Sequence, residues 1–375
     1  MKFFSMTLLI GTRQSLTTTK KGSSVIKKIA LFFGVFFLLG GWPFSGAVAQ
    51  TPGWEEIIFK DDPATRFVSG IWYKDRVYAG THNPGSVYVF GLDPLGSDVK
   101  RAFFPDKQAP TEAVLDLIAF RNELFGVVEK SPSEIRRLNW ENGTWDPVDI
   151  PSREGFYFGA VFRGNLFISG GVPKHDGMTI FRSKDGRSFV QVAHLSDWVW
   201  VPAVYQDHLY FLGHKGSAYS KGGTAAFRTN NGSRFERVPS LEGKFQYQCA
   251  YPWKGHLYLG IGGWTTARGA KNQAQIYRFD GKRREQVLVD IQMNGITSLA
   301  ACGRYLYALA DSGWESREGV STLYRTADGK DWEIVRSFPH PEMRKIEIVA
   351  GKHILLLGGK NREYAAAYLH KNFCE

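Results

Sequence analysis

The stretch that decides the fold runs from Leu166 to Val192: Leu-Phe-Ile-Ser-Gly-Gly, a polar loop, then Ile-Phe-Arg-Ser-Lys-Asp-Gly-Arg-Ser-Phe-Val-Gln-Val. The apolar runs are β-branched or aromatic, and Gly, Asp and Ser separate them, which is the composition of strands joined by tight turns. The stretch therefore predicts strand, loop, strand, turn and strand. Versions of it recur along most of the chain.

The recurrence is clearest in an anchor pair of two apolar residues that follows a turn. The pairs begin at Val77, Leu124, Leu166, Leu209, Leu257, Leu306 and Ile354. The intervals between them are 47, 42, 43, 48, 49 and 48 residues. A short apolar strand precedes each pair, and a third strand, a turn and a fourth strand follow it. Four short strands per roughly 45 residues predict the blade of a β-propeller.

The ends of the chain set the expected number of blades. The last repeat stops after its third strand, Tyr364 to His370, whereas the segment Trp54 to Ile57 resembles an isolated fourth strand. We therefore expect the N-terminal strand to complete the last blade and close the ring, because closure removes exposed sheet edges. The sequence predicts an all-β, seven-bladed β-propeller of four-stranded blades within a single domain, residues 51–375.

The turn between the third and fourth strands recurs in three similar copies, which begin at Ser183, Thr229 and Thr326. Each has an Asp or Asn that can accept hydrogen bonds from turn amides, then a Gly suited to positive φ, and later an aromatic residue. The pattern resembles the Asp-box of sialidase-like propellers, one residue shorter, and the Gly-Gly pairs resemble kelch repeats. In both families these motifs are structural turns, so the resemblance implies that Asp185 and Asp328 are not catalytic.

The first residues have the pattern of an export signal. Lys27 and Lys28 precede an apolar run that ends in Ala47-Val48-Ala49, as in a cleaved secretory signal peptide over residues 1–49. An uncleaved membrane anchor is the alternative. Export predicts a periplasmic or extracellular protein. The chain has a net charge of +11, but six of its basic residues and none of its acidic ones lie in this segment. The remainder carries only +5, which argues against a nucleic-acid partner.

Three cysteines in an exported chain of this length do not make a disulfide framework. Cys249 and Cys302 are out of register by about four residues of strand, roughly 13 Å, which is too far for a disulfide. We expect both to be small buried residues, and Cys374 has no evident partner.

Long loops between second and third strands mark the face on which we expect a ligand, because the blades vary there while the repeated box turns occupy the other face. These loops predict a ligand-binding set: Trp264, Arg268, Lys271, Trp314, Arg317 and Arg362. Indole rings suit the faces of sugars, and the cations favour an acidic glycan or a carboxylated peptide. The alternatives are that the tryptophans pack between blades and that the cations belong to a solvated surface.

Three hypotheses for function follow. The leading one is a non-catalytic binding or assembly module for acidic glycans or an envelope protein, and a purely structural envelope component is another. A third is a sialidase-like glycoside hydrolase using loops of blades five to seven, since Arg268, Arg317 and Arg362 resemble the three arginines with which sialidases hold a carboxylate. Asp311, Glu315 and Glu318 are possible carboxylates, but no nucleophile motif is present. We expect no cofactor and no metal, because His82, His175 and His214 lack metal-ligand spacing.

Overall fold

The computed structural model describes residues 53–58, 66–82, 87–90, 100–102, 113–129, 134–139, 143–151, 155–171, 177–217, 223–262, 273–312, 320–338, 342–360 and 364–374. The expected signal peptide, residues 1–49, lies outside these ranges. Within them the chain is β-structure with a single 3₁₀ turn, η1 (Pro239–Leu241). No helix in the described ranges is long and apolar enough to cross a membrane.

Three of the sheets have four antiparallel strands each. The first has the order β10 (Gly155–Phe162), β11 (Asn165–Gly171), β12 (Met178–Ser183), β13 (Phe189–Leu195). The second has the order β14 (Trp198–Tyr205), β15 (His208–His214), β16 (Thr224–Thr229), β17 (Glu236–Arg237). The third has the order β1 (Trp54–Ile58), β28 (Tyr364–His370), β27 (His353–Lys360), β26 (Glu342–Val349).

Two further sheets have eight strands. One contains β2 (Arg66–Tyr73), β3 (Arg76–His82), β4 (Val87–Phe90), β5 (Lys100–Ala102), β6 (Ala113–Phe120), β7 (Glu123–Glu129), β8 (Glu134–Leu138) and β9 (Trp145–Val148). The other contains β18 (Gln246–Trp253), β19 (His256–Gly262), β20 (Ala274–Phe279), β21 (Arg284–Asp290), β22 (Gly295–Cys302), β23 (Tyr305–Asp311), β24 (Ser321–Thr326) and β25 (Glu333–Phe338). A single residue pair joins β3 to β6 in the first and β19 to β22 in the second.

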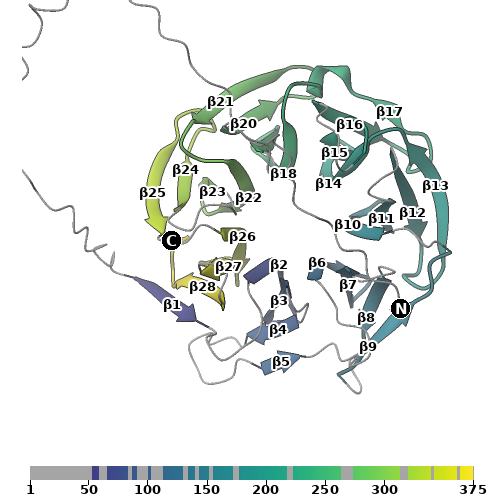
Figure 1. Cartoon of the computed structure of the whole chain (residues 1–375), viewed down its shortest axis with the longest axis horizontal. Helices are drawn as coiled ribbons and strands as arrows, with labels where there is room; N and C mark the ends of the chain where they lie inside the picture. The colour runs from purple at the N-terminus through teal and green to yellow at the C-terminus, as the bar shows by residue number, and fades with distance from the viewer. Residues whose placement is uncertain are drawn as a thin grey trace, which may run out of the picture. The chain divides into compact units, whose positions relative to one another are not determined.

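The sheets lie around a common centre in a β-propeller arrangement (Figure 1). The inner strands β2, β6, β10, β14, β18, β22 and β26 lie nearest the centre, and strands such as β13, β17, β21 and β25 lie on the rim. The all-β propeller predicted from the repeats is therefore confirmed.

The second strand of each repeat is the best buried, which explains why its sequence repeats most clearly. Every anchor residue, from Val77 and Tyr78 to Ile354 and Leu355, is between 0% and 4% exposed. These strands lie inside a sheet that is covered on both faces by neighbouring sheets, so a continuous apolar run is stabilised. Burying such a side chain contributes about 1.5–3 kcal/mol.

The N-terminal strand lies in the last sheet, as the sequence predicted. β1 pairs antiparallel with β28, and the Tyr368 hydroxyl donates to Glu56 Oε1 at 2.7 Å. The first and last repeats also share a hydrophobic cluster, in which Phe67 and Val77 pack with residues of β26, β27 and β28 such as Leu357. These contacts bring together segments from opposite ends of the described chain.

The three box turns form the same hydrogen-bonded structure. In the first, Asp185 Oδ1 accepts from the amides of Arg187 and Ser188 at 2.9 and 2.8 Å. Asn231 and Asp328 make equivalent contacts in the other two. Gly186 is required twice over, because its φ is +76° and a Cβ there would lie 2.5 Å from the Phe125 ring of a neighbouring sheet. The carboxylates of these turns are thus occupied by the backbone.

One cysteine prediction is wrong. Cys302, at the end of β22, forms a disulfide with Cys374, and the two Cα atoms are 5.2 Å apart. The tail that follows β28 passes the turn between β26 and β27 of its own sheet, where the Cys374 amide donates to the Lys352 carbonyl at 3.1 Å, and reaches Cys302 in the neighbouring sheet. Strand spacing could not reveal this pair, because the position of the tail depends on how it packs. Cys249 is a free thiol.

Candidate ligand-binding site

The structure cannot place the ligand-binding set predicted from the long loops. Trp264, Arg268, Lys271, Trp314, Arg317 and Arg362 all lie outside the described residues, as do His175, Glu315 and Glu318. The strands that carry these loops are described, however. β19 ends at Gly262, β23 at Asp311 and β27 at Lys360, so the end of the ring from which the loops leave is defined. We call this end the loop face.

Every inner strand contains a register shift close to the loop face, and the extra residue of each shift is half-buried. We call these residues the mouth ring: Val68, Leu115, Tyr157, Trp200, Gln248, Thr297 and Arg344. A bulge takes a side chain out of the alternation of its strand, and bulges are common beside functional sites. Here they place aromatic, amide, hydroxyl and guanidinium groups on consecutive inner strands.

The aromatic part of the mouth ring lies on β10 and β14. Tyr157 contacts Trp198 edge to face, with ring centroids 5.2 Å apart. Trp200 contacts the imidazole of His214, with centroids 5.1 Å apart. Next along the ring, Gln248 donates to the Gly262 carbonyl at 3.3 Å, at the point where the loop containing Trp264 begins. The mouth ring therefore adjoins the end of β19, the strand that precedes this loop in the sequence.

The cationic part lies on β26. Arg344 Nη1 lies 3.0 Å from Asp311 Oδ2, and the side chains are 12% and 2% exposed. Because Asp311 is enclosed and paired, it is not the accessible carboxylate that the hydrolase hypothesis would need. Its charge instead fixes the position of Arg344, which is oriented without being fully covered.

His214 is the most enclosed polar side chain at the loop face. It is 0% exposed, and its buried Nε2 has no hydrogen-bond partner in the described structure, whereas Nδ1 lies 3.2 Å from the Lys215 carbonyl. Burial lowers the pKa of this imidazole, so it is neutral at physiological pH. Among the described residues, no three His, Cys, Asp or Glu side chains gather as a metal site would require.

Lys215, at the start of the loop after β15, is neutralised. Its Nζ lies 2.6 Å from Glu242 Oε2, and Glu242 also pairs with Arg237 at 2.8 Å. Arg237 forms a second ion pair with Asp197, which accepts the Gly216 amide at 2.9 Å. This network holds the start of the loop after β15 against η1, and it stabilises the loop face without offering a free charge.

Two carboxyls that are largely but not fully buried lie deeper on the inner strands. Asp116 Oδ2 accepts the Gly159 amide at 3.0 Å, and Glu347 Oε1 accepts the Trp72 amide at 2.7 Å. Burial raises the pKa of Asp116 to about 6 and that of Glu347 to about 7, although the charge of Lys345 acts in the opposite direction in both. Each carboxyl binds an edge amide of the neighbouring inner strand, and this contact gives it a structural role between sheets.

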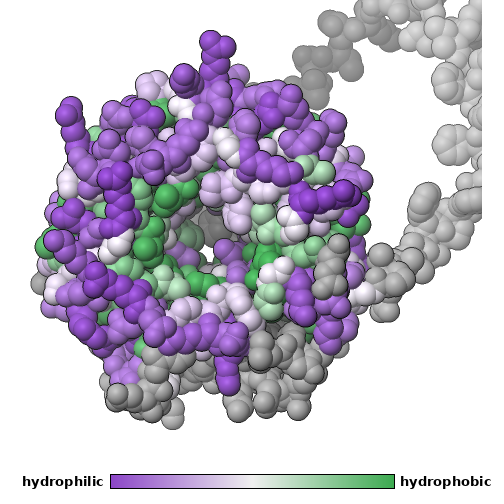
Figure 2. All heavy atoms as spheres, turned by 180° about the vertical axis from the view of Figure 1, so that it is seen from behind, coloured by the Kyte–Doolittle hydropathy of each residue, from purple (hydrophilic) through white to green (hydrophobic). Residues whose placement is uncertain are grey.

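Sequence reasoning missed the mouth ring and these carboxyls. A signal was present for Asp116, which interrupts an otherwise apolar strand, but not for Glu347, whose strand contains other charged residues. The bulges leave no such signal, because an extra residue in a strand changes neither composition nor the spacing of the anchors. Figure 2 shows one face of the molecule, on which hydrophobic residues gather around a central hollow within a hydrophilic rim. Val161 and Val204, on β10 and β14, are 40% and 38% exposed.

Comparison with protein-family models and with curated proteins finds no match. Among solved structures, the chain is similar to virginiamycin B lyase from Staphylococcus aureus, at 12% identity and a TM-score of 0.57 over 84% of this chain and 98% of the other. It is similar to YCF48 bound to D1 peptide, at 13% and 0.60 over 86% and 96%. It is also similar to a PL25 ulvan lyase bound to -[GlcA(1-4)Rha3S]-, at 10% and 0.57 over 84% and 96%. These likenesses establish the propeller fold, which is shared by enzymes and by binding proteins.

Proposed function

We propose that the chain is an exported, closed seven-bladed propeller that binds an acidic glycan at its loop face without cleaving it. Each eight-stranded sheet divides at its single connecting pair into two four-stranded blades, which supports the count. The pairing of β1 with β28 supports closure. The disulfide of Cys302 with Cys374 supports a periplasmic or extracellular location, because such bonds persist in oxidising compartments. A membrane is a partner only through an uncleaved signal segment, and nucleic acid is not one.

The observation that carries the binding proposal is the composition of the mouth ring. Trp200 and Tyr157 offer ring faces, Gln248 offers an amide, and Arg344 offers an oriented guanidinium, all half-buried on inner strands. A concave apolar surface with a few fixed polar groups is the usual form of a small-ligand site. Aromatic faces suit the C–H faces of sugars, and a guanidinium held by a buried carboxylate suits an acidic group.

The predicted loop residues extend the same proposal. Gln248 contacts the strand end from which the loop with Trp264, Arg268 and Lys271 departs. The loop with Trp314 and Arg317 follows Asp311, the partner of Arg344. Arg362 follows β27 in the last sheet. We propose that these side chains complete the site around the mouth ring.

A glycan array probed with the purified protein tests the proposal. Acidic glycans should bind, and binding should weaken with salt because exposed charges are screened over about 8 Å at physiological ionic strength. Trp200→Ala and Trp314→Ala should each weaken the binding of acidic and neutral sugars alike. Arg317→Ala should weaken mainly the binding of acidic sugars.

The arginine of the mouth ring needs a paired design. Arg344→Gln alone would leave Asp311 buried without its counter-ion, so the variant Arg344→Gln/Asp311→Asn removes both charges together. It should lose preference for acidic over neutral glycans while melting close to wild type. Arg163→Gln, an exposed arginine at the opposite end of β10, is the control and should bind normally. Absence of acidic glycans among the hits of the folded protein removes the proposal and leaves an envelope protein partner. Release of a reducing sugar would favour the hydrolase instead.

A further inference from the structure

A repeated ion pair is absent from the third repeat. Arg228, Arg278 and Arg325, each on a third strand, pair with Glu236, Glu285 and Glu333 at the register position opposite on the fourth strand, at 2.7, 2.6 and 2.5 Å. In the sheet of β10 to β13 the corresponding pair is Arg182 opposite Val190. Arg182 is left with one neutral partner, the Ser233 hydroxyl at 3.1 Å. Its charge therefore has no carboxylate partner in the described structure.

The strand that carries Val190 is also the least protected outer strand. Outer strands are normally protected against pairing by charged residues or proline. Six of them contain such residues: Glu55 and Glu56 in β1, Lys100 and Arg101 in β5, Asp146 and Pro147 in β9, Glu236 and Arg237 in β17, Arg284, Glu285 and Asp290 in β21, and Glu333 and Arg336 in β25. β13, Phe-Val-Gln-Val-Ala-His-Leu, contains none. It nevertheless has seven residues and forms the free edge of its sheet.

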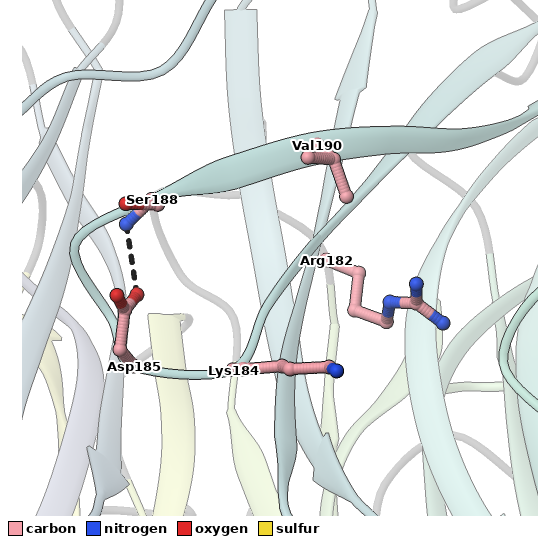
Figure 3. A pocket seen from close by; sticks show the side chains of 5 residues that line it. All are labelled: Arg182, Lys184, Asp185, Ser188 and Val190. Carbon is pink, nitrogen blue, oxygen red and sulfur yellow. Dashed lines mark hydrogen bonds between the residues drawn. The ribbon is translucent and has the colours of Figure 1, made fainter.

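The two features meet in one shallow hollow of about 280 Å³, lined by Arg182, Lys184, Asp185, Ser188 and Val190 (Figure 3). The side chains of Arg182 and Lys184 extend to the same side, and Val190 projects toward them from β13. Val190 is 52% exposed. The carboxylate of Asp185 accepts the Ser188 amide of its own turn, so it does not neutralise the two cations.

We infer that the free edge of β13 accepts a short extended peptide segment as an added strand. A carboxylate side chain of that segment binds between Arg182 and Lys184, and an apolar side chain two residues away, on the same face of the added strand, packs on Val190. The edge supplies backbone donors and acceptors, which an extended peptide satisfies in register. The two cations supply charge complementarity for the acidic residue. Together they favour a peptide over a free anion, which would use the cations alone.

The bulge of β13 limits the length of the added strand. Regular pairing with β12 is interrupted at Val192, so the regular edge next to the cations is Phe189 to Gln191. Three edge residues at about 3.3 Å each accommodate a peptide of about three or four residues. The site is therefore suited to a short acidic segment within a partner protein, and it lies apart from the mouth ring.

The probes are fluorescently labelled peptides of alternating valine and threonine that carry one glutamate, each with a twin that carries glutamine instead. A glutamate peptide should bind the purified protein about tenfold more tightly than its twin, measured by fluorescence anisotropy. Val190→Glu copies the ion pair of the neighbouring repeats and should fold normally while removing this preference. Hydrogen exchange of the amides from Phe189 to Gln191 should slow when the glutamate peptide is bound.

Glu333→Val is the matched control. This substitution removes the carboxylate partner of Arg325, so that Arg325 resembles Arg182, but it leaves the charged Arg336 on the outer strand β25. The variant should therefore bind anions at Arg325, but a bound peptide should not slow hydrogen exchange of the β25 amides. Equal binding of the glutamate and glutamine peptides, or undiminished binding by Val190→Glu, overturns the inference. So does a preference for glutamate without slower exchange at β13, which would indicate an anion site only. Binding of acidic glycans but of no peptide at this hollow overturns it as well.

Discussion

The buried carboxyl of Glu347 should make the protein less stable as the pH rises from 5 to 8. Its pKa is about 7 in the folded protein against an ordinary value of 4.5, because burial penalises the charged form. A carboxyl whose folded pKa is raised binds its proton more tightly when folded. The stability that this protonated carboxyl contributes to the folded protein is fully present below pH 4.5, declines as the pH rises and is lost above about 7.

The size of the effect follows from the two pKa values. Between pH 5 and pH 8, Glu347 should lower the free energy of unfolding by about 2.5 kcal/mol. Asp116, with a pKa of about 6 against 3.8, should lower it by a further ~1.4 kcal/mol over the same range. Asp185 and Asp328, with pKa values of about 2, stay ionised over this range, so they do not contribute to the pH dependence of the free energy of unfolding.

Urea unfolding at a series of pH values, followed by tryptophan fluorescence, measures this. Glu347→Gln can still accept the Trp72 amide but cannot ionise. Between pH 5 and pH 8 its free energy of unfolding should therefore rise by about 2.5 kcal/mol relative to that of the wild type. His214, whose pKa is lowered by burial, titrates in the opposite sense, but it is present in both proteins and cancels from the difference. Asp207→Asn, at an exposed turn, is the control. A Glu347→Gln curve parallel to wild type would refute the reasoning.

Further outcomes are expected elsewhere. Lys345→Met should shift the pH-dependent loss of stability to higher pH, because the Lys345 charge favours ionised Asp116 and Glu347; an unchanged profile would contradict this. Cys374→Ser opens a loop of 72 residues and should cost about 4 kcal/mol in the chain-entropy model, measured as a loss in urea unfolding that reductant does not increase. Asp328→Ala removes the acceptor of two turn amides, so it should lower the melting temperature and leave glycan binding intact. Deletion of Trp54–Ile58 should expose β28 and cause aggregation in light scattering, and a variant as soluble and stable as wild type would oppose ring closure.

The repeats predict the propeller because burial on both faces of the sheet requires large apolar residues at every anchor. Leu166 and Leu257 occupy equivalent places in their sheets, and each is 0% exposed, so their sequences converge. The turn at Asp185 is equally predictable, since its hydrogen bonds are local in the chain.

Features that depend on contacts between repeats were beyond sequence reasoning. Cys374 meets Cys302 only after the tail has passed the turn between β26 and β27 and reached the neighbouring sheet, a path that no strand period describes. Trp200 reaches the mouth ring through a bulge, which the spacing of the anchors does not reveal. The pairing of Arg344 with Asp311 joins two sheets, and neither residue was distinguishable from a solvated charge before the sheets were assembled.

The position of β1 also dictates the order in which the last sheet can be completed. Glu56 contacts Tyr368 across 312 residues of chain, and Trp72 contacts Glu347 across 275. The first strand to leave a ribosome or a secretion channel therefore has no partner until the last has emerged. Contacts between residues so distant in sequence slow folding, because the entropy cost of closing a large loop comes before the contacts can stabilise the chain. Throughout that wait β1 and the inner edge of the first sheet are open to other chains, so a helper that shields unpaired strands during export would act at this step.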